Sequence, residues 1–163
     1  MHDLFAPPGN AWQPVSPQLR RMRRAVLGVL AGLLLVAILA GEVLFGLPSW
    51  LLVVVMPAVV VLAVVGWVVV GRNARAWGYA ERDEDLYITH GATYKELVVV
   101  PYGRMQFVDI TAGPLEQVYG IASVRLHTAS PGTSARIPGL PKDEAARLRD
   151  RLTALGETQA AGL

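Results

Sequence analysis

The chain has 163 residues, of which 53% are hydrophobic and 17% are charged, and its formal net charge is +2. Soluble domains carry about 25% charged residues and disordered chains are poor in apolar residues, so this composition excludes a uniformly soluble globular protein and a wholly disordered chain. The sequence contains no cysteine, which excludes disulfide scaffolds, Cys-ligated zinc, iron–sulfur clusters and thiol catalysis.

The charged residues are distributed unevenly along the chain. Residues 1–24 carry four Arg and one Asp, residues 25–71 carry Glu42 alone, and residues 72–163 carry eleven basic and eleven acidic side chains. The pI near 9.2 therefore reflects a short basic cluster ahead of an apolar segment and not a nucleic-acid-binding face. We expect residues 1–24 to form an N-terminal cytoplasmic segment, and we expect no nucleic-acid partner.

Two long apolar segments follow, at residues 25–47 and 50–71. The first would be about 34 Å long as a helix, against a hydrocarbon core of roughly 30 Å, and only Pro48 and Ser49 separate the two. The sequence therefore predicts a membrane hairpin of two transmembrane helices. Two buried helices of a soluble protein are disfavoured because neither segment has a polar face. A cleaved signal peptide is disfavoured because the apolar run is long, no A-x-A site follows it, and a second span comes at once.

Positive charges flank this hairpin at both of its ends, whereas the connecting turn carries none. The positive-inside rule then places both termini in the cytoplasm, which predicts a multi-pass protein of the cell membrane. Arginine and tryptophan side chains favour the lipid headgroup region. The predicted membrane-interface anchors, which would contact the lipid bilayer, are Arg20, Arg21, Arg23, Arg24, Trp50, Trp67, Arg72, Arg75 and Trp77.

Three features of the predicted hairpin are unusual for a purely apolar transmembrane segment. Glu42 is ionisable within a span, and it either reaches the outer interface, which is the simpler interpretation, or contacts an ion or a partner. Gly28 and Gly32 have the spacing of a small-xxx-small pair, which lets helices pack closely, although a segment rich in Gly and Ala also produces such spacing by chance. Pro57 removes one backbone hydrogen bond near mid-span and predicts a kink in the second helix.

From Arg72 onward, short runs with strand character alternate with turn residues. Leu86 and Ile88, for example, share one face of their run, and Gly113-Pro114 closes another. Six strands are predicted, at residues 76–81, 85–90, 94–100, 105–112, 121–128 and 134–138, with a short helix or turn at 114–119.

One amphipathic helix is predicted after the last strand. Pro141 and the acidic residues behind it are typical of a first helical turn. The apolar stripe of this helix consists of Ala145, Leu148, Leu152 and Leu155. Gly156 is the predicted helix end, and residues 157–163 are predicted to be a frayed tail. The cytoplasmic domain would then span residues 76–156, as a mainly-β fold whose open end the helix covers.

A longer pattern joins these elements. The run VVPYGRMQFVDI at residues 99–110 continues into Gly113-Pro114-Leu115, Gly120 and the strand through residues 124–129, and Ile137-Pro138-Gly139-Leu140 comes later. Upstream, Trp12, Ser16-Pro17 and the Arg cluster precede the two spans. In order and spacing, these residues resemble the second type of bacterial PH-like domain, as found in YdbS-like membrane proteins. The resemblance covers residues 12–155, and no single motif in it is catalytic.

The resemblance implies both a fold and a setting. The fold would be a PH-like, partly open barrel of two sheets that is capped by a C-terminal helix and carried on a two-span membrane anchor. Members of the family are often encoded beside a larger relative with several such domains, which implies a complex with another membrane protein. Some relatives are linked to resistance against membrane-active peptides, which implies a role in envelope stress.

The residues offer little support for catalysis. Asp109, His127 and Ser123 have the chemistry of a hydrolytic triad, but strand alternation places Ser123 and His127 on the face that would meet solvent or an interface. No nucleophile elbow, HExxH, P-loop or GxGxxG is present. The three histidines are isolated in the sequence, so no metal site is expected. We expect no enzymatic activity and no cofactor.

A polar cluster of Arg104, Gln106 and Asp109 follows the tight turn that opens the fourth strand. In the structural interpretation, Arg104 and Asp109 satisfy loop carbonyls or pair with each other. In the functional interpretation, the cluster is a contact surface for a partner domain or peptide. The first hairpin loop, residues 81–85, carries four acids and one base, so it would repel a polyanionic headgroup and disfavours phosphoinositide recognition by that route.

These observations favour an interaction module that is fixed at the cytoplasmic face of the membrane. Its expected partner is another membrane protein with PH-like domains, with self-association as a further expectation. The alternative hypothesis is a lipid-binding or lipid-handling module whose barrel mouth lies against the inner leaflet. The net neutrality of residues 72–163 and the acidic first loop favour the interaction module.

Overall fold

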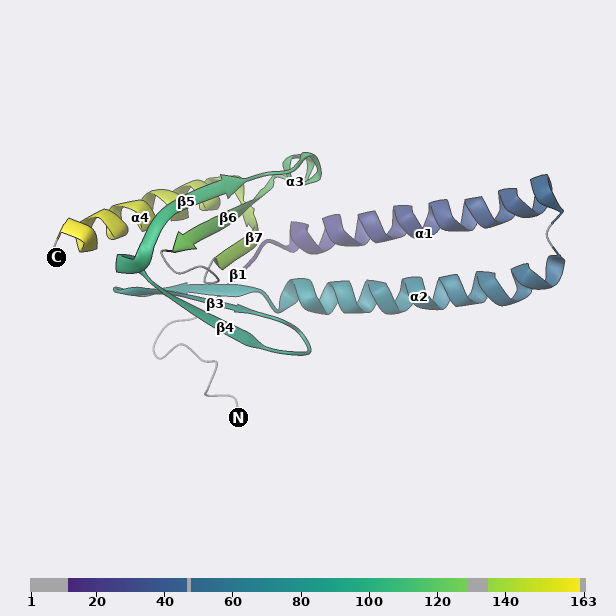
Figure 1. The fold of residues 1–163 in the computed structure, drawn as a ribbon, viewed down its shortest axis with the longest axis horizontal. Helices are drawn as coiled ribbons and strands as arrows, with labels where there is room; N and C mark the ends of the chain where they lie inside the picture. Colours follow the sequence, from purple (N-terminus) through teal and green to yellow (C-terminus); the bar gives the residue numbers. More distant parts are fainter. Residues whose placement is uncertain (1–11, 47, 129–134, 162–163) are drawn as a thin grey trace. The chain divides into compact units, whose positions relative to one another are not determined.

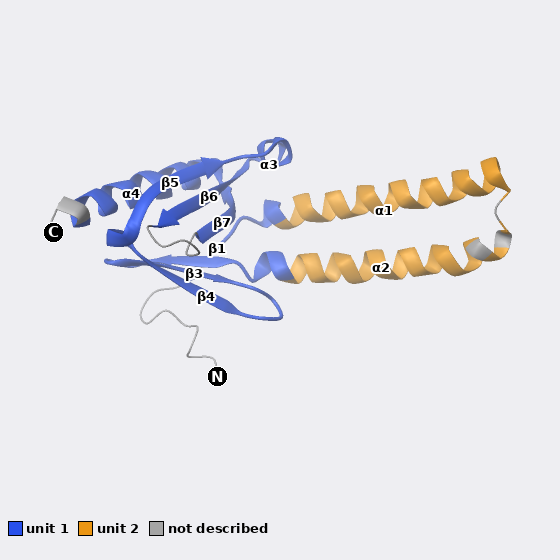
Figure 2. Cartoon of the chain, viewed as in Figure 1, with its two compact units in different colours: residues 1–19, 73–163 blue, residues 20–72 orange. Residues whose placement is uncertain are grey.

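The computed structural model describes residues 12–46, 48–128 and 135–161 (Figure 1). The chain divides into two compact units (Figure 2). One unit is built from residues 1–19 together with residues 73–163, and the other is residues 20–72. The first unit is therefore assembled from two stretches of sequence that are separated by the whole apolar region.

Residues 20–72 contain most of two helices, α1 (Pro17–Phe45) and α2 (Ser49–Arg75). The first turn of α1 and the last turn of α2 belong to the other unit. Both are long and apolar enough to cross a membrane, and the most apolar stretch of each is unburied. α1 begins at Pro17, earlier than the apolar run alone indicates. Ser16 explains this start, because its Oγ accepts a hydrogen bond from the Gln18 backbone N–H at 3.2 Å and proline favours the first helical position.

The two helices approach each other closely at Gly66, a glycine that was not predicted to pack. A Cβ at Gly66 would lie 3.3 Å from the Leu27 Cδ atoms, so the absence of a side chain there lets Leu27 pack against α2. The predicted packing pair, Gly28 and Gly32, has nothing within 4 Å of the position of its Cβ atoms. These two glycines therefore do not pack against α2, and they stay a prediction for contact with a helix of another molecule.

The other unit contains two antiparallel sheets and a C-terminal helix. The first sheet has the order β1-β2-β3-β4 and the second the order β5-β6-β7. Its strands are β1 (Gln13–Pro14), β2 (Gly78–Glu81), β3 (Asp85–His90), β4 (Glu96–Pro101), β5 (Met105–Thr111), β6 (Ile121–Thr128) and β7 (Ala135–Pro141). Its helices are η2 (Tyr102–Arg104), α3 (Pro114–Val118) and α4 (Lys142–Ala161). The bounds of β3 and β6 are as predicted.

The core lies where α4 meets the second sheet. Ala145, Leu148 and Leu152 of the predicted stripe are fully buried, and α4 packs against β5, β6 and β7. Leu86 and Ile88 of β3 are also buried, which confirms that they share a face. A fully buried Leu or Ile side chain contributes about 1.5–3 kcal/mol, so this helix is a main source of stability for the unit.

The structure corrects two predicted boundaries in the C-terminal part of the chain. α4 continues through Gly156 to Ala161, so Gly156 is not the helix end. Residues 157–161 of the predicted tail are helical, and residues 162–163 lie outside the described part. Gly156 lies where α4 passes the β4–β5 corner, and a Cβ there would be 3.8 Å from the Tyr102 carbonyl oxygen. β7 extends to Pro141, beyond the predicted residue 138. Pro138 is tolerated because β7 is an edge strand.

The segment before α1 belongs to this folded unit, although the sequence predicted there only an N-terminal cytoplasmic segment with a basic cluster. β1 pairs with β2, with Gln13 opposite Tyr79, and the Ser16 backbone N–H donates to the Gly139 carbonyl at 2.9 Å. Leu19 is 1% exposed. Its side chain occupies the space beside Gly139, where a Cβ would come within 2.6 Å of the Leu19 Cβ.

Alanine at two glycines of positive φ should separate backbone strain from this packing. Gly139 has φ +71° and Gly120 has φ +68°, but a Cβ at Gly120 would meet nothing within 4 Å. We expect Gly120→Ala to cost about 1–2 kcal/mol from the left-handed backbone alone, and Gly139→Ala to cost about 1–3 kcal/mol more from overpacking. Thermal unfolding of the full chain in detergent, followed by near-ultraviolet circular dichroism, measures both. Equal losses would mean that Leu19 is not held against Gly139.

Candidate functional site

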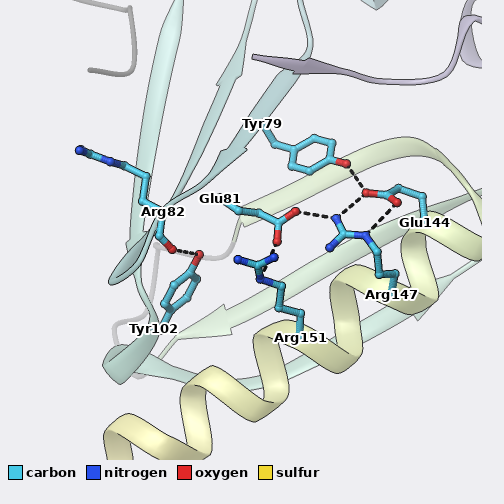
Figure 3. A network of polar contacts seen from close by, with 7 residues as sticks. All are labelled: Tyr79, Glu81, Arg82, Tyr102, Glu144, Arg147 and Arg151. Atoms are coloured by element: carbon cyan, nitrogen blue, oxygen red, sulfur yellow. Dashed lines mark hydrogen bonds and ion pairs between the residues drawn. The ribbon is translucent and has the colours of Figure 1, made fainter. Parts of the chain in front are cut away.

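A network of charged side chains joins β2 to α4 (Figure 3). Glu81 on β2 accepts a hydrogen bond from Arg147 at 2.6 Å and pairs with Arg151 at 3.1 Å, although its side chain is only 6% exposed. Arg147 also donates to Glu144, which accepts a further bond of 2.6 Å from the Tyr79 hydroxyl. The network ties the first sheet to the helix that covers the second sheet, so its role is structural.

This network perturbs the ionisation of its members. The Arg147 guanidinium is the largest influence on Glu144 and holds the pKa of that carboxyl below its ordinary value. Hydrogen bonds from Arg147 to Glu144 and Glu81 raise the pKa of Arg147. Burial, followed by the bond to Glu144, raises the pKa of the Tyr79 hydroxyl. The pair of Glu144 and Arg147 therefore stays charged, and the Tyr79 hydroxyl stays a donor, at neutral pH.

The first hairpin loop is shorter and less acidic than the sequence indicated. Glu81 lies in β2 and Asp85 begins β3, so the turn between them consists of residues 82–84. Tyr102 closes this turn, since its hydroxyl donates to the Arg82 carbonyl at 2.9 Å and its backbone N–H to the Glu84 carbonyl at 3.0 Å. Burial raises the pKa of the Tyr102 hydroxyl. These hydrogen bonds from Tyr102 to backbone carbonyls hold the turn, and the side chains of Asp83 and Glu84 are exposed.

The predicted contact residue Asp109 belongs to a cluster on the exposed face of the second sheet. Its Oδ2 lies 3.5 Å from His127 Nε2 on the neighbouring strand β6. The Phe107 ring stacks on the His127 ring, with centroids 4.2 Å apart, and Phe107 is 51% exposed. Asp109 therefore pairs with His127 and not with Arg104, the pairing that the structural interpretation allowed.

The other two predicted contact residues lie along the same strand edge. Arg104 is an exposed residue of η2, directly before β5, and Gln106 is exposed near the start of β5. A groove of about 190 Å³ runs between β5 and α4 and is lined by Gln106, Phe107 and Leu152, among others. Since β5 ends the order of its sheet, the three predicted residues follow one open edge of the domain.

Sequence reasoning did not connect Phe107 and His127 with the predicted contact residues, although strand alternation placed His127 on a face that would meet solvent or an interface. Alternation along β5 would have placed Phe107 and Asp109 on one face, which is a usable signal. The opposition of Phe107 to His127 depends on the register between β5 and β6, which includes an irregularity between Met105 and Phe107. A one-residue irregularity of this kind is not visible in the hydrophobic pattern.

The structure separates Ser123 from Asp109 and His127, the other two residues that resembled a triad. Ser123 is fully buried, which corrects its expected exposure to solvent or an interface, although Arg125 on the same strand face is exposed as expected. Its hydroxyl donates to Glu116 Oε1 and accepts from Arg136 Nη2, each at 2.9 Å, while His127 is paired with Asp109. Within the described ranges, no group of three or more acidic or histidine side chains could hold a metal ion.

Two of the predicted interface tryptophans have partners within their own unit. The Arg24 guanidinium carbon lies 4.9 Å from the centroid of the Trp67 ring, both on the hairpin. Trp77 stacks on His90, with ring centroids 4.7 Å apart. Trp50 is 64% exposed at the other end of the hairpin. Whether these residues meet lipid stays a prediction, as it does for Arg20, Arg21, Arg23, Arg72 and Arg75.

Comparison with known proteins identifies the family. A model of the bacterial PH domain matches residues 24–155. The chain belongs to the bacterial PH domain family. Its relatives include the UPF0699 transmembrane protein YdbS of Bacillus subtilis (strain 168), which is 28% identical over 149 residues and matches 91% of this chain and 92% of that protein. No solved structure gives a significant match.

For this bacterial PH domain protein, the match confirms the expected resemblance. Two apolar helices, two antiparallel sheets and a C-terminal helix constitute the predicted membrane hairpin with a PH-like domain. The protein is a membrane protein, since it has two helices able to span a bilayer and a transmembrane relative of nearly its own length. The match does not extend to a molecular activity.

The lowered pKa of Glu144 predicts a pH dependence of stability. Its stabilising contribution is complete above the ordinary carboxyl pKa of 4.5 and is lost as the pH falls through the lower pKa of the folded state. We expect Glu144→Gln to lower the free energy of unfolding by about 1 kcal/mol near neutral pH and by less near about pH 4. Thermal unfolding at both pH values measures the difference. Asp150→Asn, at an exposed carboxyl, is the control. If Glu144→Gln lowered the free energy of unfolding equally at both pH values, the role of the network would be contradicted.

Proposed function

We propose that this protein is a non-enzymatic, membrane-anchored interaction module, a subunit or adaptor of a complex with another membrane protein. The hairpin would hold the PH domain at the cytoplasmic face of the cell membrane, with both termini in the cytoplasm. The six flanking arginines support this orientation, because positive residues are retained on the cytoplasmic side. The separation of Ser123 from the Asp109–His127 pair supports a module without catalysis.

The open edge of β5 is the observation that carries the proposal. Sheet edges expose unpaired backbone donors and acceptors, and proteins usually protect them. Among the described strands, none pairs with the outer edge of β5. An extended segment of a partner can add to such an edge as a further strand, with its side chains in an adjoining groove. The groove between β5 and α4 adjoins this edge and could take the side chains of the added strand.

The side chains around the edge suit protein recognition. Phe107 supplies an exposed aromatic surface, and its ring is fixed by stacking on His127. Binding energy at interfaces concentrates in such aromatic residues surrounded by polar groups. Arg104 and Asp109 carry opposite charges at the two ends of the segment, so they would favour one register and direction of an incoming strand.

The partner would be a membrane protein that itself carries PH-like domains, as the family resemblance implies. Gly28 and Gly32 offer a second point of contact, because they have open space around them on α1 and small residues let membrane helices approach closely. The same surface would serve self-association if the partner were a second copy. The role in resistance to membrane-active peptides stays an implication of the resemblance.

Photo-crosslinking from the β5 edge tests this function. A photoreactive residue at Gln106 in the full-length protein, expressed in its native membrane, should crosslink to one membrane protein with PH-like domains. Arg104→Ala with Asp109→Ala should lower the yield about tenfold, because two charged contacts are lost. The variant should remain in the membrane.

The matched control is Arg149→Ala with Asp150→Ala. It also removes one cation and one anion from an exposed pair, but on α4. We expect this control to keep the full yield. Equal yields from both double variants would remove the β5 edge as the site. The absence of any protein crosslink from position 106 would overturn the interaction function.

A further inference from the structure

A second cavity, of about 280 Å³, lies on the first sheet at the end of the domain where α2 enters it. Its walls include two indole rings from residues far apart in the sequence and two basic side chains. The lining residues on which its chemistry depends are Trp12, Arg75, Trp77, Gly78, Thr89 and Lys95. None of them belongs to the β5 edge, which lies in the other sheet.

The fold holds both indoles in place. Trp12 directly precedes β1, which pairs with β2. A Cβ at the buried Gly78 would lie 3.6 Å from Trp12 Cε3 and 3.3 Å from Thr89 Cγ2, so a larger residue would press on both. Trp77 is fixed by its stacking on His90. Contacts within the sheet therefore fix the positions of both aromatic rings that line the cavity.

The charge of the cavity is positive. The ionisable side chains among its described lining residues are Arg75 and Lys95, and both are exposed. The neighbouring acid, Glu96, lies 3.7 Å from His90 Nε2. A guanidinium and an ammonium at one cavity are the usual donors to a phosphate group.

The covalent chain keeps this cavity close to the membrane. Arg75 is the last residue of α2, and Trp77 follows two residues later. Each residue spans at most about 3.6 Å, so Trp77 lies within about 7 Å of Arg75, the last residue of α2. This is the depth of the headgroup layer, where tryptophan rings and basic side chains are favoured.

We propose that this cavity binds the phosphate of an anionic phospholipid headgroup. Arg75 and Lys95 would donate to the phosphate oxygens, and the faces of Trp12 and Trp77 would contact the glycerol and the first carbons of the acyl chains. The site goes beyond the proposed interaction function and does not depend on it, because it uses a different sheet of the same domain.

Lipid titration of the purified full-length protein tests the site. Native mass spectrometry from detergent micelles would count bound phosphatidylglycerol and phosphatidylcholine with identical acyl chains. We expect one tightly bound phosphatidylglycerol, held about tenfold more tightly than phosphatidylcholine. Arg75→Glu with Lys95→Glu should abolish that preference. Lys142→Glu with Arg149→Glu, which reverses two exposed charges on α4, should retain it.

Further arms keep the test decisive. Lys95→Glu alone, at an exposed position, should weaken phosphatidylglycerol binding severalfold even if the double variant does not fold. Trp12→Ala should weaken both lipids, because it removes apolar contact and no charge. Unchanged preference in the Lys95 variant, or equal affinity for the two lipids in the unmodified protein, would overturn the proposal. Displacement of the lipid by millimolar inorganic phosphate would also overturn it, in favour of a soluble phosphate ligand.

Discussion

The packing of α4 is the interaction on which the rest of the domain depends. Ala145, Leu148 and Leu152 bury one face of the helix against the second sheet, while Arg147 and Arg151 on the same helix reach Glu81 in the first sheet. One element thus fastens both sheets. The nearly buried carboxylate would cost several kcal/mol if it were left unpaired, so the two arginines also fix which residues of β2 face the helix.

Much of this fold follows from short-range patterns in the sequence. The alternation in β3 and β6 and the stripe of α4 predicted those elements because each has one buried face. The two-residue strand β1 carries too few residues for a pattern, so it could not be predicted. Glycine is the residue typical of a helix end, but α4 continues through Gly156 where it packs against the β4–β5 corner, a tertiary contact that a local pattern does not reveal. Arg104, Gln106 and Asp109 could be selected by type, whereas the Asp109–His127 pair required the strand register.

The domain presents different chemistry on its two sheets. The first sheet carries a basic, aromatic cavity beside the end of α2. The second carries an open strand edge with an aromatic ring and charges of both signs. A surface that is mainly cationic suits a lipid phosphate, and one that combines backbone donors with mixed charge suits a polypeptide. The two kinds of contact can therefore coexist in one small domain without competing for residues.

The pairing of β1 with β2 has a consequence for biogenesis. Gln13 and Tyr79 are partners across a strand ladder, yet the entire apolar hairpin is synthesised between them. A bilayer cannot separate two strands that share hydrogen bonds, so this pairing requires the hairpin to return to the side from which it entered. A chain that stopped after one crossing would leave β1 and Leu19 without their partners. Completion of the folded domain therefore requires both crossings of the hairpin.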